Sequence, residues 1–486
     1  MRLFRDRPDW QLLCGLVVGL VAFNAWLTHA AGFELHYDEA QYWEWSQHLD
    51  WSYYSKGPLL AWLIALAESL FGHGEWQVRL FAWFTHGIFL VLVFGLTRRL
   101  WHSRAAAWWG VMITLTTPLY FTLGLVMTTD IFLFAFWTWG LWAAQRALYQ
   151  NRDSAWYELG AAVGLGALVK LSIGLLPAAI GVLVMVMPHW RRHLLNPHVW
   201  GGMALMLVCM APMLLWNHQN DWMMFRHELG HVGHENWSFT RLIKFLLGQW
   251  LALSPIVVVI AITVLRRIPA TSHHRLLWLV SLACTLFFIF KAGGDKVQLN
   301  WPAPTYIGFI VLFAGAIPNL TTPKQRLLLS GIFTSVIFLA IASFPYQFGL
   351  SARYDPLKEV KSWHRPVTAI AATAPPADFI LTDKYELAAE LSFYWPKRLP
   401  VYIAGNANRR FNQHDLWPAI DREAGHDALF ISTRPEPPPE LARAFHQCTV
   451  LPSVIARAPD GSPLRTLYAR HCLYYVSILW PTPQYY

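Results

Sequence analysis

Carboxylates and a lysine lie close together, among aromatic side chains, where the first apolar run of the sequence ends. The stretch from Gly32 to Pro58 contains Asp38, Glu39 and Lys56. A carboxylate in such a place can take a proton from a hydroxyl group, and a lysine can hold a phosphate as a point charge. Taken alone, the stretch has an ordinary explanation, because aromatic residues anchor membrane interfaces and an Asp-Glu pair can cap a helix.

Further charged residues are expected on the same side of a membrane. Asp130 opens an apolar run in Thr128-Thr-Asp130, Lys170 ends another, and Lys296 precedes a third together with Asn300 and Trp301. A capping aspartate and a snorkelling lysine explain each of these residues separately. Together they predict a site at the lipid–water boundary that handles a lipid-linked phosphate.

A sugar linked to a polyprenyl phosphate carries its own leaving group, so the bond breaks without a protonating acid. Cations must stabilise the departing phosphate, and a carboxylate must orient and deprotonate the acceptor hydroxyl as the sugar passes through an oxocarbenium-like state. The charged residues above are of the types that this chemistry needs.

The composition indicates a membrane protein that holds these residues on helices. The chain has 486 residues, of which 55% are hydrophobic and only 14% charged, and its mean hydropathy is +0.32. A soluble domain has about 25% charged residues. Apolar runs long enough to span a bilayer predict a polytopic α-helical membrane protein with about eleven spans. The expected spans are 11–31, 77–97, 105–123, 128–149, 157–171, 173–188, 200–216, 243–265, 275–291, 303–317 and 326–345.

The net charge of +9 is spread over short loops and does not form a nucleic-acid-binding stripe, so no nucleic-acid partner is expected. With the N-terminus inside, every basic cluster falls on the cytoplasmic side, as the positive-inside rule requires. The first span is expected to be an uncleaved anchor. The clusters are Arg2, Arg5 and Arg7; Arg98, Arg99 and Arg104; Arg191 and Arg192; Arg266 and Arg267; and Lys324 and Arg326.

Two further parts complete the predicted architecture. Residues 56–72 are too short to span and predict a helix lying in the interface. After residue 345 the charged fraction rises and strand–helix–strand patterns appear, so residues 1–345 are expected to form the transmembrane catalytic domain. Residues 346–486 are expected to form a small soluble α/β domain outside the cytoplasm. There Cys448 and Cys472 could form a disulfide or stay unlinked.

The membrane part resembles the integral-membrane glycosyltransferases of the GT-C fold. It is most similar to bacterial glycosyltransferase family 39 and to the aminoarabinose transferases that modify lipid A. The motifs that carry the resemblance are His36-Tyr-Asp-Glu-Ala-Gln-Tyr42, Ser52-Tyr-Tyr-Ser-Lys-Gly-Pro-Leu59, Met127-Thr-Thr-Asp-Ile131, Gly164-Leu-Gly-Ala-Leu-Val-Lys170 and Lys296-Val-Gln-Leu-Asn-Trp-Pro302. The tail, with Thr382-Asp-Lys-Tyr385, resembles family 39 tails through weaker motifs.

The resemblance implies roles for individual residues. Asp38 would be the catalytic base and Asp130 a second catalytic carboxylate, while Lys56, Lys170 and, by its position, Lys296 would hold the donor phosphate. The aminoarabinose transferases have a glutamate where this chain has Ser55, which puts the aminoarabinose donor in doubt. Expected substrate contacts are Glu39, Tyr42, Tyr54, Asn300 and Trp301.

The histidine-rich segment from Phe225 to Trp237 contains His227-Glu-Leu-Gly-His231, an HExxH string typical of zinc proteases. Glycines within it disfavour a stable helix, and no third ligand is evident. The resemblance places the segment near the donor, where His231 or His234 could contact the phosphate or a divalent metal. No cofactor is required by the sequence; a divalent metal is possible.

The sequence thus predicts an inverting glycosyltransferase in the bacterial inner membrane. Its donor would be a polyprenyl-phosphate sugar, and its acceptor a lipid, glycan or protein near the membrane lipids. A protein O-mannosyltransferase is the alternative within this class. A lipid-linked sugar transporter or flippase would instead carry charges at mid-span. An intramembrane metalloprotease would need the HExxH string inside a span.

Overall fold

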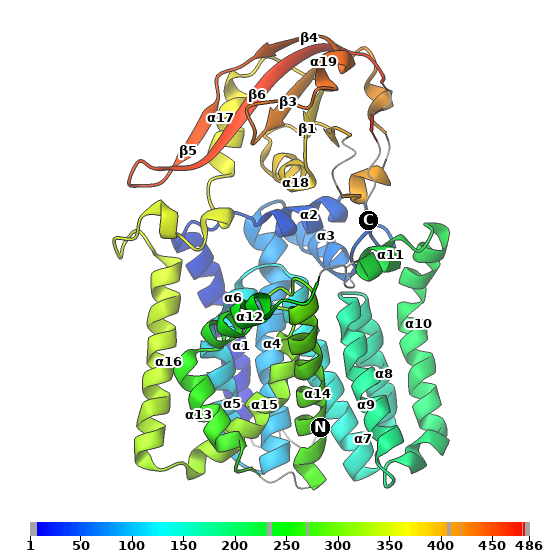
Figure 1. The fold of residues 1–486 in the computed structure, drawn as a ribbon, viewed down its shortest axis with the longest axis vertical. Helices are drawn as coiled ribbons and strands as arrows, with labels where there is room; N and C mark the ends of the chain where they lie inside the picture. The colour runs from blue at the N-terminus through cyan, green and yellow to red at the C-terminus, as the bar shows by residue number, and fades with distance from the viewer. Residues whose placement is uncertain are drawn as a thin grey trace.

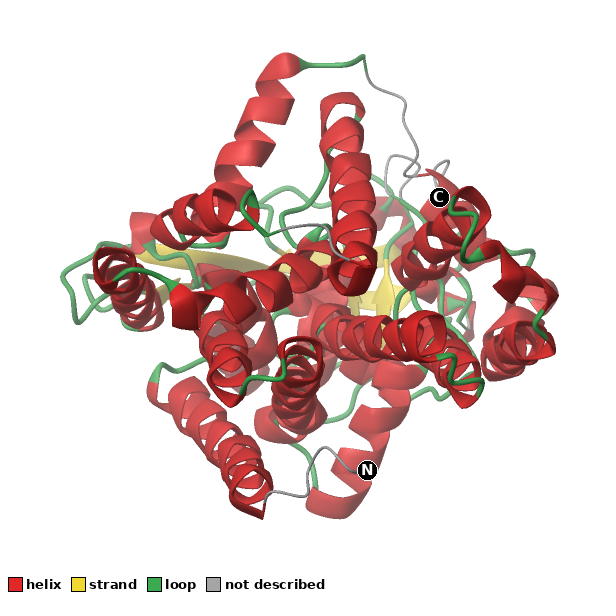
Figure 2. Cartoon of the chain, turned by 90° about the horizontal axis from the view of Figure 1, so that it is seen from below, coloured by secondary structure: helices red, strands yellow, loops and turns green. Residues whose placement is uncertain are grey.

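A bundle of helices carries a smaller domain with a β-sheet at one end of the molecule (Figure 1). The computed structural model describes residues 7–230, 236–268, 272–405, 410–417, 419–478 and 480–481. Seen from below, the strands lie behind the helices, at the far end of the bundle (Figure 2). The molecule therefore has two layers, and the chain segments between them are placed to form a site.

Apart from 105–123 and 243–265, each predicted span falls on a helix that runs along the long axis of the molecule in Figure 1. Within the described residues, five helices are long and apolar enough to cross a membrane, or up to seven if two bent pairs count as single spans. The count of about eleven crossings stays a prediction. The helices on which the predicted spans fall are α1 (Arg7–Ala30), α4 (Glu75–Trp101), α5 (Arg104–Thr116), α7 (Thr129–Gln150), α8 (Ser154–Ala167), α9 (Leu175–Val186), α10 (Pro197–Gln219), α13 (Pro255–Leu265), α14 (Ser272–Gly294), α15 (Ala303–Ala316) and α16 (Thr322–Ser343).

Two predicted spans are interrupted by prolines. The range 243–265 is two helices, α12 (Phe239–Ala252) and α13, which are bent by 96° at their junction. Pro255 cannot continue the hydrogen-bond ladder, and Ser254 takes a left-handed backbone conformation with φ of 72°. Similarly, the predicted range 105–123 is two helices, because α5 ends at Thr116 and Pro118 begins α6 (Pro118–Leu125). The bend of 118° lies further on, between α6 and α7, where two separate spans were predicted. The prediction of one continuous helix was therefore wrong at both places.

Two short helices lie between the bundle and the sheet domain (Figure 1). The first, α2 (Tyr37–Ser46), begins with a capping box: the side chain of His36 accepts the Asp38 N–H, and the carboxylate of Glu39 accepts the His36 N–H. The second, α3 (Leu59–Phe71), occupies the range predicted for an interfacial helix.

The C-terminal domain is a mixed sheet with helices, as the strand and helix patterns predict. The strands are ordered β2-β1-β3-β6-β4, with β5 also pairing to β6; β1 lies parallel to β2 and β3, and β6 runs antiparallel to β3 and β4. A disulfide joins Cys448 to Cys472 across β4 and β6. The elements are α17 (His364–Thr373), β1 (Phe379–Thr382), α18 (Tyr385–Tyr394), β2 (Val401–Ile403), β3 (Ala428–Ser432), α19 (Leu441–Ala444), β4 (Phe445–Val450), β5 (Val454–Arg457) and β6 (Pro463–Tyr475). The domain boundary at residue 345 stays a prediction.

The sheet domain is attached to α2 by buried polar contacts. The carboxylate of Glu44 lies 3.0 Å from the Ser392 hydroxyl and 3.1 Å from the His414 imidazole. The Tyr394 hydroxyl accepts the Leu35 N–H at 2.7 Å. Helix α18 packs on α2 and contributes Ser392 and Tyr394, so the sheet domain covers the segment that carries Asp38.

Candidate active site

A cavity of about 640 Å³ lies between the helix bundle, α2 and the sheet domain. Its walls come from segments far apart in the sequence, including the segment between α1 and α2, the α6–α7 junction, the segment after α8 and the segment before α15. Most of the residues singled out in the sequence line this cavity: Asp38, Tyr42, Lys56, Asp130, Lys170, Asn300 and Trp301.

Asp38 faces the cavity from the first turn of α2. Its carboxylate lies 3.6 Å from the His36 ring, and 42% of its side-chain surface is exposed. This exposure is to a narrow space enclosed by protein, so loss of hydration raises the pKa of Asp38. The charges of His36 and Lys56 act in the opposite direction, and those of Asp130 and Glu39 raise the pKa further. A raised pKa makes the carboxylate a stronger proton acceptor.

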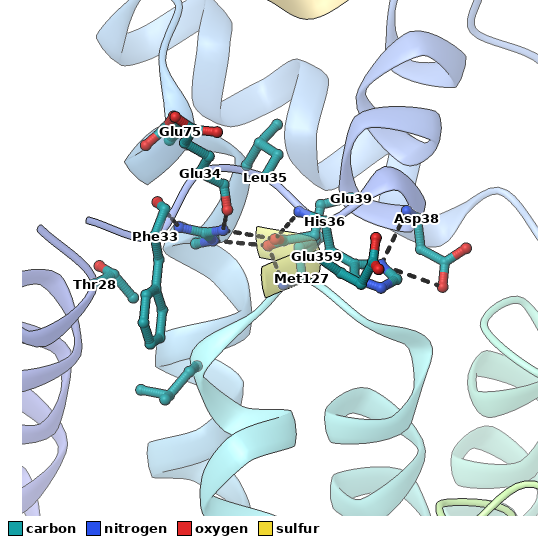
Figure 3. A network of polar contacts seen from close by, with 12 residues as sticks. Thr28, Phe33, Glu34, Leu35, His36, Asp38, Glu39, Glu75, Met127 and Glu359 are labelled. Carbon is teal, nitrogen blue, oxygen red and sulfur yellow. Dashed lines mark hydrogen bonds and ion pairs between the residues drawn. The ribbon is translucent and has the colours of Figure 1, made fainter. Parts of the chain in front are cut away.

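Glu39, expected to contact substrate, is fully buried and does not line the cavity. Arg79 of α4 donates to both of its oxygens, at 2.8 and 2.7 Å. The backbone N–H groups of His36 and Met127 also donate to it, at 3.0 and 2.7 Å. Burial alone would raise the pKa of Glu39, but Arg79 and these N–H groups hold it below its usual range. Figure 3 shows Glu39 inside this network and Asp38 pointing away from it.

Arg79 extends the network to the segment that follows α1. Its guanidinium donates to the carbonyl oxygens of Phe33 and Glu34, at 3.0 and 2.7 Å, and its side chain is 1% exposed. The buried pair therefore fixes three segments to one another: the residues before α2, helix α4 and the α6–α7 junction. Glu39 positions Asp38, because the two residues share one helical turn.

Asp130 joins two other cavity residues at the start of α7. Lys170 lies 2.9 Å from one oxygen of its carboxylate, and the Asn300 amide donates to the other oxygen at 2.7 Å. The side chains of Asp130 and Lys170 are 5% and 13% exposed. Both oxygens of the carboxylate are thus engaged, which fixes the ammonium group of Lys170 at the cavity wall.

Lys56 has a partner that the motifs did not indicate. Its ammonium group lies 2.8 Å from Glu228 of α11 (Met223–Gly230). Burial would raise the pKa of Glu228, but the charge of Lys56 and its hydrogen bond lower it. The preceding residue, His227, is buried, lines the cavity and lies 3.0 Å from the Tyr54 hydroxyl.

The first two residues of the HExxH string therefore have different partners: His227 contacts Tyr54, and Glu228 pairs with Lys56. The histidines predicted to contact a metal, His231 and His234, lie outside the described residues. Among the residues that are described, no group of three histidine, cysteine or acidic side chains is arranged to hold a metal ion.

Two other predicted contacts are not among the residues that line the cavity. Tyr54 is buried, its ring lies tilted against those of His227 and Phe411, and its backbone N–H donates to Gln413 at 2.7 Å. Lys296 is exposed and follows Asp295, whose carboxylate accepts its backbone N–H. Tyr54 therefore connects α11 to the sheet domain, behind the cavity wall.

The sheet domain contributes cavity residues that the sequence motifs mostly missed. Tyr385, at the start of α18, and Arg410 line the cavity together with Glu359. Burial raises the pKa of Tyr385, so its hydroxyl stays protonated. The Thr382–Tyr385 motif could have pointed to Tyr385, but no sequence motif contains Arg410 or Glu359.

Known proteins resemble this chain in sequence. Residues 55–216 match the family model described as dolichyl-phosphate-mannose-protein mannosyltransferase. The chain is 27% identical over 395 residues to the lipid A galacturonosyltransferase RgtD of Rhizobium johnstonii, covering 78% of this chain and 81% of that protein. It is 27% identical over 336 residues to an undecaprenyl phosphate-alpha-4-amino-4-deoxy-L-arabinose arabinosyl transferase of Pectobacterium carotovorum, covering 63% and 58%.

The fold resembles ArnT from Cupriavidus metallidurans, whose crystal structure was determined with undecaprenyl phosphate bound. The TM-score is 0.64 at 18% identity, over 94% of this chain and 98% of that one. The chain therefore shares the fold of ArnT. The structural match includes most of the sheet domain as well as the bundle, because it extends over nearly all of this chain. The named relatives are glycosyltransferases, which favours the enzyme over a transporter or a protease.

Proposed function

We propose that this protein is a glycosyltransferase that moves one sugar from an undecaprenyl-phosphate donor to a lipid or glycan acceptor, with inversion, and that Asp38 is the base. One observation carries the proposal: Asp38, Lys56 and Lys170 line one cavity at the end of the bundle that faces the sheet domain. The relatives support the donor class, since the arabinosyl transferases are named for undecaprenyl-phosphate sugars. The name of RgtD supports lipid A as an acceptor to test.

The proposed reaction is a single displacement at the anomeric carbon. The acceptor oxygen forms a bond to that carbon, the bond to the phosphate oxygen breaks, and the acceptor proton passes to Asp38. Lys56 and Lys170 stabilise the negative charge that develops on the departing phosphate. Undecaprenyl phosphate and the glycosylated acceptor are the products, and no protonating acid is needed.

Asp130 and Glu228 have supporting roles in this proposal. Each carboxylate holds one lysine at the cavity, at 2.9 Å for Lys170 and 2.8 Å for Lys56. A fixed ammonium group loses less freedom when the phosphate arrives, so the site is organised before the donor binds.

We further propose that the sheet domain lies outside the cytoplasm, in a bacterial inner membrane. The Cys448–Cys472 disulfide supports this orientation, because such bonds persist in oxidising compartments. Cysteines placed at the exposed positions Asp153 and Asp460 test it. A membrane-impermeant thiol reagent added from outside should label position 460 and not 153; the reverse pattern would overturn the orientation.

The experiment that tests the function uses the full chain in detergent or nanodiscs. Undecaprenyl-phosphate derivatives of several sugars are offered with lipid A, and the glycolipid product and released undecaprenyl phosphate are both measured. Transfer from at least one donor, absent in Asp38→Asn, supports the proposal. Full activity in Asp38→Asn, or no transfer from any donor, would end it. A peptide acceptor tests protein mannosyl transfer, which the family model over residues 55–216 favours.

A further inference from the structure

A hollow of about 270 Å³ lies between α8, α9 and α10, which Figure 1 shows at one side of the bundle. No described residue lines both this α9–α10 hollow and the active-site cavity. Lys170, between α8 and α9, lies at that cavity, so the start of α8 and the end of α9 point to the opposite end of the bundle. The lining is mostly apolar; Trp156, Val163, Ile180, Val184, Val199 and Met203 are representative.

Close packing of α8 on α10 gives the hollow a fixed floor. A Cβ on Gly160 of α8 would lie 2.0 Å from the Gly202 carbonyl oxygen, and a Cβ on Gly202 would lie 2.3 Å from the Trp156 carbonyl oxygen. Helix α9 packs on α7 and α14, and a Cβ on its Gly181 would meet nothing within 4 Å. The hollow is therefore a space that the packing of three helices leaves between α9 and α10.

A buried histidine at one end of the hollow has an unused polar atom. His193 belongs to the 3-10 helix η3 (Arg191–Leu195), lines the hollow and is only 5% exposed. Its Nε2 has no hydrogen-bond partner among the described residues. Burial lowers the pKa of His193, Arg192 adds to this effect and Asp153 opposes it. The neutral ring can donate its Nε2–H to an oxygen of a ligand in the hollow.

Two arginines stand beside this histidine. Arg191 and Leu194 lie on the same face of η3, because residues three apart eclipse in a 3-10 helix, and Leu194 lines the hollow. Arg191 donates to the Met185 carbonyl oxygen at 2.7 Å, and Arg192 donates to the Asn151 amide oxygen at 2.6 Å. Both of these acceptors are neutral, and both arginines are exposed. The end of the hollow therefore carries two positive charges beside an apolar space.

We propose that the α9–α10 hollow holds one acyl chain of an anionic phospholipid, whose phosphate lies at Arg191 and Arg192 and accepts a hydrogen bond from His193. Bilayer and hollow are equally apolar, so the chain itself contributes little affinity. The hollow fixes where the chain lies, and the arginines supply the preference for a negatively charged headgroup. This site is separate from the proposed reaction and adds a structural lipid to the protein.

The test measures binding of two phospholipids that differ only in their headgroups. The full chain in detergent is titrated with dioleoyl phosphatidylglycerol, which is anionic, or with dioleoyl phosphatidylcholine, which is zwitterionic. Native mass spectrometry gives the Kd of the first bound lipid. The ratio of the two Kd values is the headgroup preference, and the parent protein should favour phosphatidylglycerol by about tenfold or more.

The charge of the site is tested with paired arginine variants. Arg191→Gln combined with Arg192→Gln should bring the headgroup preference close to one. The matched control is Arg266→Gln combined with Arg267→Gln, which removes another exposed pair, after α13, and should keep the parent preference. His193→Leu should also lower the preference without lowering the unfolding temperature, because it removes a buried polar group that has no partner.

The hollow itself is tested with an aromatic side chain. Gly181→Phe fills it, displaces the chain and should lower the headgroup preference. The matched control is Gly15→Phe in α1: Gly15 is exposed, does not line the hollow, and a Cβ there also meets nothing within 4 Å. This variant should bind both lipids as the parent protein does.

Equal losses in the two arginine variants would overturn the proposal, because general attraction to the basic face would then explain the preference. A parent protein without headgroup preference, or an unchanged preference in Gly181→Phe or in His193→Leu, would also overturn it. None of these measurements depends on sugar transfer, so their outcome leaves the proposed function as it stands.

Discussion

Asp38 and Glu39 are adjacent in the sequence, but their side chains leave the same helical turn on different sides. The side chain of Asp38 is 42% exposed toward the cavity, whereas that of Glu39 is fully buried and bound twice by Arg79. Successive helical residues point about 100° apart, so one carboxylate can face substrate while the next anchors the helix. Asp38 is therefore available for the proposed reaction, whereas Glu39 stabilises the helix that carries it.

Asp38→Asn should abolish transfer without unfolding the protein. The amide keeps the shape of the side chain but cannot accept the proton of the acceptor hydroxyl, so the rate should fall about 10²- to 10⁴-fold. Product formation in the purified protein measures this loss, and an unchanged thermal unfolding temperature is the control.

Glu39→Gln should act on stability. The amide leaves the buried Arg79 guanidinium without a neutralising charge, and breaking a buried ion pair costs about 3–5 kcal/mol. Thermal unfolding in detergent should show a clear decrease in midpoint, while donor KM in the remaining folded protein stays near the parent value. A normal midpoint combined with a large rise in donor KM would instead make Glu39 a substrate contact.

Lys170 and Asp130 should behave as one unit. Their side chains lie 2.9 Å apart, so Lys170→Met and Asp130→Asn remove the same interaction. The double variant should lose less than the sum of the single losses in kcat/KM, with a coupling free energy of about 0.5–3 kcal/mol. Strict additivity would show that Lys170 acts on the donor independently of Asp130.

Transfer should decline as the pH falls through the pKa of Asp38, because only the carboxylate accepts a proton. Desolvation raises that pKa, so the acid limb of kcat/KM should lie above the ordinary aspartate value of 3.8. Lys56 lowers the same pKa, so Lys56→Gln should move the limb to higher pH in the residual activity. If the acid limb of kcat/KM does not move in Lys56→Gln, a group other than Asp38 controls the pH dependence.

Glu390 of α18 gives a pH effect on stability that is separate from catalysis. Its side chain is fully buried, and neither oxygen has a hydrogen-bond partner among the described residues. Desolvation raises its pKa well above 4.5, with the charge of Arg465 opposing and those of Glu34 and Glu75 adding to the effect.

The native state therefore holds a proton that the unfolded chain loses above pH of about 4.5, so stability should fall as the pH rises from that value. Glu390→Gln should remove this decrease, because an amide does not titrate. The measurement is the unfolding midpoint of the full chain over a series of pH values. A decrease of the same slope in both proteins would assign the effect to other groups.

Features coded locally in the sequence could be predicted well. Apolar runs placed the long helices, and strand–helix–strand patterns placed β1, α18 and β2, since hydrophobic periodicity reflects burial directly. The helix breaks at Pro118 and Pro255 were not predicted, although a proline cannot continue the hydrogen-bond ladder of a helix.

Long-range partners could not be predicted. The sequence shows two adjacent carboxylates, but Arg79, which lies 40 residues after Glu39, decides which of them is buried. Likewise, Glu228 is 172 residues from Lys56, and its motif suggested a metal instead. The motifs found Asp130, Lys170 and Asn300, but only the fold shows that they form one hydrogen-bonded group.

The attachment of the sheet domain has a kinetic consequence. Hydrogen bonds of Tyr394, Ser392 and His414 hold the sheet domain on the segment that carries Asp38. The domain therefore cannot move away from this segment without breaking them. Substrates that cannot reach the cavity from the side covered by the sheet domain must diffuse to it within the plane of the bilayer. The rate of this enzyme should then follow the mole fraction of its lipid substrates in the membrane, and diluting them with inert phospholipid should slow it even at constant bulk concentration.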